Sequence, residues 1–135
     1  MRTFEQLFAP YEQALALKEL KFDEPCLKYY VKQNLNTDYS HSILKLKQEN
    51  FINGECLAPT YAQAFDFIRT KYRIESWVQP YLSPEPRRNE AKFWYGGRTP
   101  SEGTSIGIYD THLEAELECL KHLIQFIKEH DEFNI

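Results

Sequence analysis

Apolar residues at helical spacing mark three segments of the chain as helices. The first covers residues 3–20, where Thr3 can cap the helix and Pro10 should break or kink it, so the firmer part begins at Tyr11. The second runs from about Tyr61 to Tyr72. The third follows Thr111 and carries a long apolar stripe, formed by Leu113, Leu117, Leu120, Ile124 and Ile127.

Two of these helices begin with a capping-box pattern. Thr60 is followed by Gln63, and Thr111 is followed by Glu114. In such a box the Thr hydroxyl accepts the third backbone N–H, and the Gln or Glu side chain reaches back to the cap. Both helix starts are therefore predicted at these threonines.

Segments rich in β-branched and aromatic residues predict five strands. Residues 26–33 and 42–48 should pair as a hairpin, with Lys45 and Lys47 on its exposed face. The polar connection 34–41 between them is expected to be mobile. Residues 75–82, 91–96 and 105–109 follow the second helix, with glycines and prolines between them, and should form a meander.

The order of elements is α, ββ, α, βββ, α, which predicts a single α+β domain: an antiparallel sheet of about five strands with three helices on one face. A length of 135 residues fits one domain, 1–135. Residues 1–10 are expected either to pack on this domain or to form a loosely packed N-terminal extension. The proline-rich stretch 83–89 is expected to be a long loop within the domain.

Cysteine content and hydropathy indicate the compartment. The three cysteines are odd in number and far apart, so they predict neither a disulfide framework nor a zinc site, and each is expected to be a small core residue. No apolar run approaches the roughly 18 residues of a membrane span, and acids stand near the N-terminus where a signal peptide would be apolar. We therefore expect a cytoplasmic protein without a membrane anchor.

Motifs that carry catalytic chemistry are absent from the sequence. The four histidines form no HExxH or Cys/His cluster, and the glycines 96–97, 103 and 107 lack the context of a phosphate-binding loop. No nucleophile stands in a recognisable elbow. The expectation is a protein that is not an enzyme and uses neither a cofactor nor a metal.

Charge is distributed unevenly along the chain. Residues 69–98 carry 7 basic and 3 acidic side chains, whereas residues 99–135 carry 2 and 8. Basic and aromatic side chains that alternate can hold a phosphate backbone and stack bases, or can meet an acidic protein surface. The candidate partner-binding or nucleic-acid-binding residues are Arg87, Arg88, Lys92, Trp94, Tyr95 and Arg98, joined by Lys45 and Lys47.

The same residues have a structural interpretation. Alternation over residues 92–95 can place Phe93 and Tyr95 in the core, and the two arginines at 87–88 can be solvated loop residues. In the same way, Arg69, Lys71 and Arg73 crowd the end of the second helix, where the helix dipole favours cations.

Three runs of sequence carry a resemblance to a known group of proteins. They are residues 11–26, 56–65 and 114–121, which contain ALALKEL, FDEPC, CLAPTYAQAF and EAELECLK. In this order they resemble a group of small phage and prophage proteins from Bacteroidetes. The chain departs from that group at Lys21, where the group carries Gly, and in the N-terminal segment 1–10.

The resemblance implies a genomic setting and carries over no catalytic residue. Small phage accessory proteins often act against host machinery, and Bacteroidetes hosts carry RNA-targeting type VI-B CRISPR systems. The resulting hypothesis is a phage-derived inhibitor, an anti-CRISPR protein that binds the type VI-B nuclease or its guide RNA. The alternatives are a non-inhibitory nucleic-acid-binding accessory protein, a protein-interaction module, either as a monomer or as a homodimer, and an enzyme whose site is assembled from scattered residues.

Overall fold

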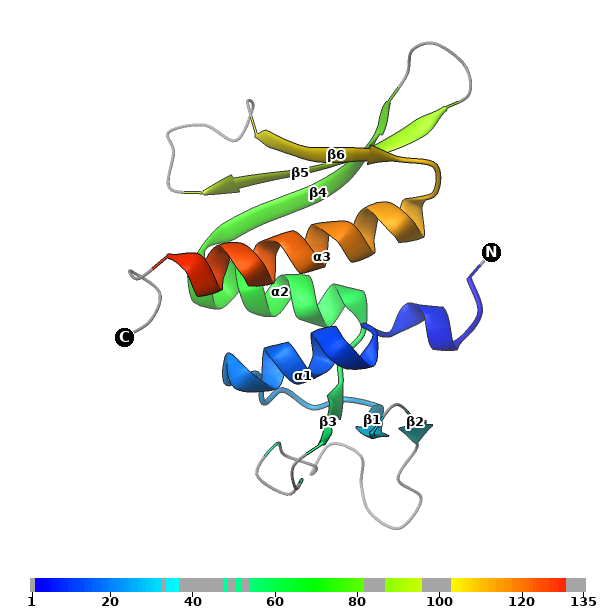
Figure 1. Ribbon diagram of the computed structural model, residues 1–135, viewed down its shortest axis with the longest axis vertical. Coiled ribbons are helices and arrows are strands. Elements are labelled where there is room, and N and C mark those ends of the chain that lie inside the picture. Colours follow the sequence, from blue (N-terminus) through cyan, green and yellow to red (C-terminus); the bar gives the residue numbers. More distant parts are fainter. Residues whose placement is uncertain are drawn as a thin grey trace. The chain divides into compact units, whose positions relative to one another are not determined.

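The computed structural model describes residues 2–32, 34–36, 48, 51, 54–81, 87–95 and 103–130. The chain divides into two compact units, residues 1–64 and 65–135, and each unit is described by itself (Figure 1).

The first unit combines helix α1 with a three-stranded antiparallel sheet. A short 3₁₀ helix, η1 (Glu5–Leu7), precedes α1 (Tyr11–Glu19), and the strands are β1 (Lys28–Val31), β2 (Asn34–Asn36) and β3 (Glu55–Ala58). Strand β1 is central and pairs with β2 on one side and with β3 on the other. Pro10 stands at the N-cap of α1, so the expected break at this residue is confirmed.

The core of the first unit joins the N-terminal segment to the sheet. Phe8 and Ala9 are buried, and the phenol of Tyr30 donates a hydrogen bond of 2.7 Å to the Ala9 carbonyl. The Ala9 N–H donates to the Pro59 carbonyl at 2.9 Å. Cys56 is fully buried in the same cluster. These contacts make residues 8 and 9 part of the core of this unit.

Helix α1 ends in a Schellman motif. The Phe22 N–H donates to the Leu17 carbonyl at 2.9 Å, and the Lys21 N–H donates to the Lys18 carbonyl at 3.0 Å. The motif requires a left-handed conformation at the residue directly after the C-cap. Lys21 occupies that position with a φ of 72°. Glycine is the residue that this position favours, because a Cβ is disfavoured at positive φ.

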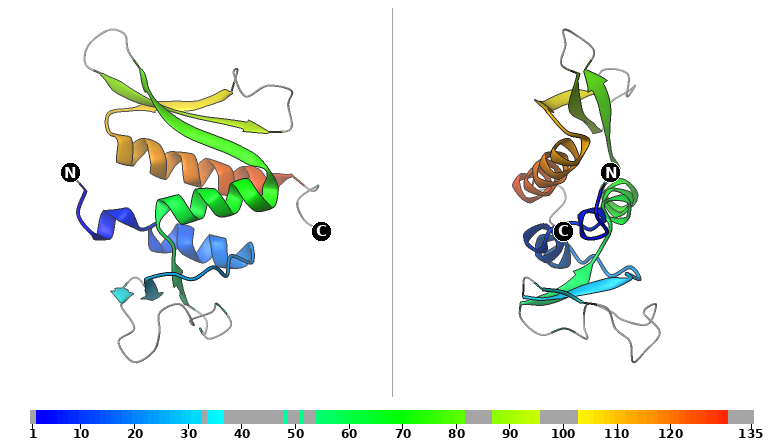
Figure 2. Two further views of the ribbon diagram at one scale, coloured as in Figure 1. Left: turned by 180° about the vertical axis from the view of Figure 1, so that it is seen from behind. Right: turned by 90° about the vertical axis from the view of Figure 1, so that its right-hand side faces the viewer.

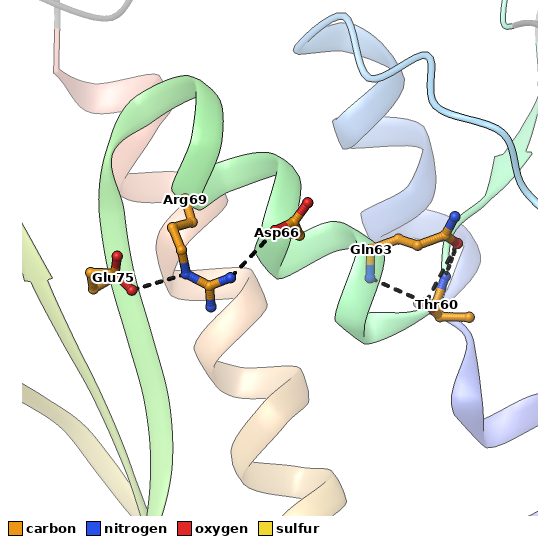
Figure 3. A network of polar contacts seen from close by, with 5 residues as sticks. All are labelled: Thr60, Gln63, Asp66, Arg69 and Glu75. Atoms are coloured by element: carbon orange, nitrogen blue, oxygen red, sulfur yellow. Dashed lines mark hydrogen bonds and ion pairs between the residues drawn. The ribbon is translucent and has the colours of Figure 1, made fainter.

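Helix α2 (Tyr61–Tyr72) begins with the capping box expected from the sequence. The Gln63 N–H donates to the Thr60 hydroxyl at 3.1 Å, and the Thr60 N–H donates to Gln63 Oε1 at 3.0 Å (Figure 3). The reciprocal pair satisfies two N–H groups that would otherwise lack a partner at the helix start.

The second unit contains a three-stranded antiparallel sheet in the order β4-β5-β6, with helix α3 on one face. The strands are β4 (Ile74–Tyr81), β5 (Arg88–Tyr95) and β6 (Thr104–Tyr109), and α3 spans His112–Glu129. Figure 2 shows α3 running along this sheet, and it contacts all three strands. The Glu114 N–H donates to the Thr111 hydroxyl at 3.0 Å, which confirms the predicted start of α3.

Side chains of β5 and α3 form the core between the sheet and this helix. The Phe93 ring lies 5.0 Å from His122 and 5.3 Å from Phe126, centroid to centroid. Ala91 on β5 is fully buried. Six residues of α3 are buried as well: Ala115, Cys119, Leu120, Leu123, Ile124 and Ile127.

A β-bulge interrupts the pairing of β5 with β6. Ala91 is paired with Gly107, but the next residue, Lys92, is paired with Ser105. The extra residue, Ile106, has no partner on β5 and bends the strand locally.

The prediction of one sheet of about five strands is wrong in its pairing. The described residues form six strands in two three-stranded antiparallel sheets. Strand β1 pairs with β2 on one side and with β3 on the other. Of its expected hairpin partner, residues 42–48, residues 42–47 lie outside the described residues. Residues 34–36, expected in a mobile connection, form β2. The α+β class and the three α-helices are confirmed for the described residues.

Candidate nucleic-acid interface

Alternation along β5 separates the predicted binding residues into two sets. Phe93 is buried and Tyr95 lies 5.6 Å from the Phe126 ring, so both face α3. Arg88, Lys92 and Trp94 are on the opposite face, because successive residues of a strand point to opposite sides. The structural interpretation of the sequence is therefore correct for Phe93, which is in the core, whereas Tyr95 faces α3 but is only partly buried.

The opposite face of the sheet is not covered by α3, and we call it the open face. Residues paired directly across an antiparallel sheet share a face, so the register assigns its members. They are Glu75, Trp77, Gln79 and Tyr81 on β4, Arg88, Glu90, Lys92 and Trp94 on β5, and Ser105 and Ile108 on β6. None of these ten residues is buried.

Both tryptophans of the protein lie on the open face. The Trp77 indole N–H donates to Gln79 Oε1 at 2.9 Å, and the Gln79 amide donates to Glu90 Oε1 at 3.1 Å. A methyl group at Gly103 would overlap the Trp77 ring, so this ring lies directly against the Gly103 backbone. Trp77 is thereby held by a hydrogen bond within β4 and by a contact with the residue before β6.

Short contacts engage the acids of the open face more than its bases. Glu75 accepts a hydrogen bond of 2.9 Å from Arg69 Nε, and Glu90 accepts the bond from Gln79. Arg88 makes only a long contact with Asp110, 3.9 Å, and both side chains are more than half exposed. Lys92 makes no ion pair with any residue that the structure describes.

A pocket of about 550 Å³ opens at one end of the open face. Its lining combines three aromatic residues with two arginines and one glutamate: Tyr72, Trp94, Tyr95, Arg69, Arg73 and Glu75. All six belong to the second unit. The volume falls within the roughly 300–1,000 Å³ of small-ligand pockets.

The two arginines of the pocket differ in their contacts. Arg69 bridges Asp66, at 3.5 Å, and Glu75, at 2.9 Å, and so connects the end of α2 to the start of β4 (Figure 3). Arg73 is exposed and has a φ of 59° directly after α2. A non-glycine residue in this left-handed conformation is strained, and such strain is found at functional sites. Among the described residues, no ion pair involves Arg73.

The remaining predicted site residues are placed as follows. Arg87 is exposed immediately before β5. Arg98, Lys45 and Lys47 lie outside the described residues.

The aromatic and basic residues of this region that were not predicted as site residues are Tyr72, Trp77, Tyr81, Arg69 and Arg73. The signal for Trp77 and Tyr81 was present, because both stand on alternate positions of a predicted strand. Arg69 and Arg73 were not predicted because the helix dipole, which favours cations at the end of α2, already explained their positions.

The cysteines of the chain are structural. Cys26, Cys56 and Cys119 are free and buried, as expected from the sequence. Burial raises the pKa of Cys26 to about 12, that of Cys56 to about 11 and that of Cys119 to about 12. The reactive form of cysteine is the thiolate, so these thiols are poor nucleophiles at neutral pH.

Two absences concern the described part of the chain only. Within it, no cluster of three or more His, Cys, Asp or Glu side chains is arranged to hold a metal ion. No helix in the described ranges has the length and apolar character needed to cross a bilayer.

Comparison of the chain with protein-family models, with curated protein sequences and with solved structures finds no match.

Proposed function

We propose that this protein acts by binding single-stranded RNA on the open face of the β4-β5-β6 sheet, and not by catalysis. The observation that supports this most is that both tryptophans share one exposed sheet face with the cations Arg88 and Lys92. An exposed sheet with aromatic side chains is a recurrent platform for single-stranded RNA, because unstacked bases can lie on the rings.

The energetics of stacking and charge agree with this function. Base-aromatic stacking contributes about 1–3 kcal/mol per base and tolerates any sequence. Two rings, Trp77 and Trp94, can therefore supply several kcal/mol without a specific hydrogen bond. Lys92, Arg88 and the adjacent Arg87 can bind phosphates, which releases counterions and makes the affinity depend on salt.

The resemblance to phage proteins narrows the biological role that we propose. The RNA would then be the guide RNA of a host type VI-B CRISPR complex, and the protein would inhibit that complex as an anti-CRISPR protein. The tryptophans and the cations of the open face support an RNA contact in this role, and the choice of host complex rests on the resemblance alone.

The binding test uses the two tryptophans as the probe. Titration with a fluorescently silent oligonucleotide, U12 RNA, should quench their emission, because both indoles lie on the proposed binding face. The logarithm of the affinity should fall linearly with the logarithm of the salt concentration, with a slope of about −2 for three phosphate contacts on a single strand.

Charge reversal tests which basic residues bind the RNA. The triple variant R87E/R88E/K92E should lose nearly all affinity while its circular dichroism stays that of the wild type. Lys121→Glu is the matched control, because Lys121 is an exposed lysine on α3 whose one ion pair, with Glu118, is also exposed. Full RNA affinity in the triple variant, or an affinity independent of salt, would contradict the proposal. Capture of a host protein without RNA would instead indicate that the open face binds a protein.

A further inference from the structure

The pocket beside the open face has features that the proposed function does not use. Trp94 belongs to both, so an RNA strand that lies on the open face reaches the pocket at this residue. The described residues make no ring contact with Trp94, whereas Tyr95 packs on Phe126 and Tyr72 packs on Phe67. Trp94 therefore offers the free aromatic surface of the pocket.

The charges of the pocket fit one phosphodiester. Its two guanidinium groups and one carboxylate give a net charge of +1, which matches the single negative charge of one backbone phosphate. Arg69 is already held by Asp66 and Glu75, so Arg73 is the cation available to that phosphate.

The carboxylate of Glu75 adds a hydrogen-bonding preference. Arg69 Nε donates to Oε2, and no described residue hydrogen-bonds to Oε1. An ionised carboxylate can only accept hydrogen bonds. A base with an exocyclic amino group, such as cytosine, can donate one to Oε1, whereas uracil presents a carbonyl oxygen at the corresponding position.

We infer that this pocket is a base-reading subsite, which stacks one base on Trp94, binds its phosphate at Arg73 and selects an amino-bearing base through Glu75. If the bound nucleotide is part of an RNA strand, this inference rests on the proposed function. A free nucleotide offers the same base and phosphate, so the test includes both oligonucleotides and mononucleotides.

The experiment compares cytosine with uracil, which have the same ring size. Tryptophan quenching by C6, U6, CMP and UMP is measured for the wild type and for Glu75→Gln, with Glu114→Gln on the exposed start of α3 as the control. The wild type and the control should bind C6 about tenfold more tightly than U6. In Glu75→Gln the preference should disappear, because an amide can also donate to the uracil oxygen. Its affinity for both oligonucleotides should rise, because Arg69 loses a charge partner.

The outcomes separate the two proposals. Equal binding of C6 and U6 by the wild type would overturn the subsite and leave RNA binding intact. Preference for CMP over UMP without any oligonucleotide binding would support the subsite with a free nucleotide as its ligand and overturn the proposed function. Absence of binding by all four ligands would overturn both. A preference for C6 that persists in Glu75→Gln would remove Glu75 from the recognition.

Discussion

The Trp77 indole lies so close to the Cα atom of Gly103 that no larger residue fits at position 103 without displacing the ring. The contact joins β4 to the residue before β6 across the open face. It explains why glycine occupies this position, although its φ is not in the left-handed region.

Gly103→Ala should therefore disturb Trp77. A methyl group would push the indole away from the sheet or shift the backbone, and overpacking of this kind costs about 1–3 kcal/mol. We expect a red shift of the tryptophan emission and a lower midpoint of urea unfolding. Ser105→Ala, at an exposed position of β6, should change neither. An unchanged emission spectrum in Gly103→Ala would contradict the described contact.

Two helix ends offer a matched test of strain and function. Lys21 and Arg73 both follow a helix with positive φ, at 72° and 59°. Glycine relieves the strain at either position, so Lys21→Gly and Arg73→Gly should each raise the free energy of unfolding by up to about 1 kcal/mol. Only Arg73→Gly should also weaken RNA binding, by about tenfold, because only Arg73 lines the pocket. Equal RNA affinity of the two variants would show that Arg73 does not contact the ligand.

The two tryptophans should contribute to RNA binding independently. Trp94→Ala and Trp77→Ala should each cost about 1–3 kcal/mol of binding free energy, as expected for the loss of one stacked base. Trp94→Phe should retain most of the affinity, because a smaller ring still stacks. Isothermal titration calorimetry measures these variants without relying on their fluorescence. Affinity that is insensitive to both alanine substitutions would exclude stacking on the open face.

Much of the fold follows from local patterns in the sequence. Helices α2 and α3 begin at the predicted capping residues, and Pro10 separates η1 from α1 as expected. The three strands of the second unit lie within three residues of their predicted bounds, because apolar alternation and turn residues mark them directly.

The first unit shows where local patterns fail. Strand β3, with the sequence ECLA, was not predicted, because three of its four residues are buried and it therefore lacks the alternation of a half-exposed strand. Strand β2, with the sequence NLN, has low β propensity and is a strand because β1 pairs with it. Strand pairing joins residues far apart in the chain, which a local pattern does not specify.

Local patterns likewise indicate which residues of β5 share a face, but they do not give the pairing of β5 with β4. Alternation in β5 correctly separates Lys92 and Trp94 from Phe93 and Tyr95. Alternation also marks Trp77 on β4, but the register is what places it on the same face as Lys92, which it stands directly opposite.

Buried thiols predict a loss of stability in alkali. The pKa values of Cys26, Cys56 and Cys119 are raised to about 11–12 by burial, whereas an unfolded thiol titrates near 8.5. The folded state therefore favours the protonated form. This contribution is complete below about pH 8.5 and is lost as the pH rises through the folded pKa values.

The size of this loss can be measured by urea denaturation between pH 7 and pH 10.5. Each thiol should lower the free energy of unfolding by about 1.4 kcal/mol per pH unit above pH 9. Cys119→Ala should reduce the slope of the free energy of unfolding against pH by roughly the contribution of one thiol. A free energy that is constant up to pH 10.5 would show that the thiols are not shielded from solvent.

The β-bulge at Ala91–Lys92 also limits which ligands the open face can accept. The extra residue of the bulge is on β6, and a bulge increases the local right-handed twist where its strand pairs with β5. The end of β5 near Arg88 and the end near Trp94 are therefore rotated relative to each other. A rigid planar molecule can lie flat on one end only. A chain with a rotatable bond between its units can follow the twist and contact both ends, so flexibility of the ligand becomes a criterion for recognition in its own right.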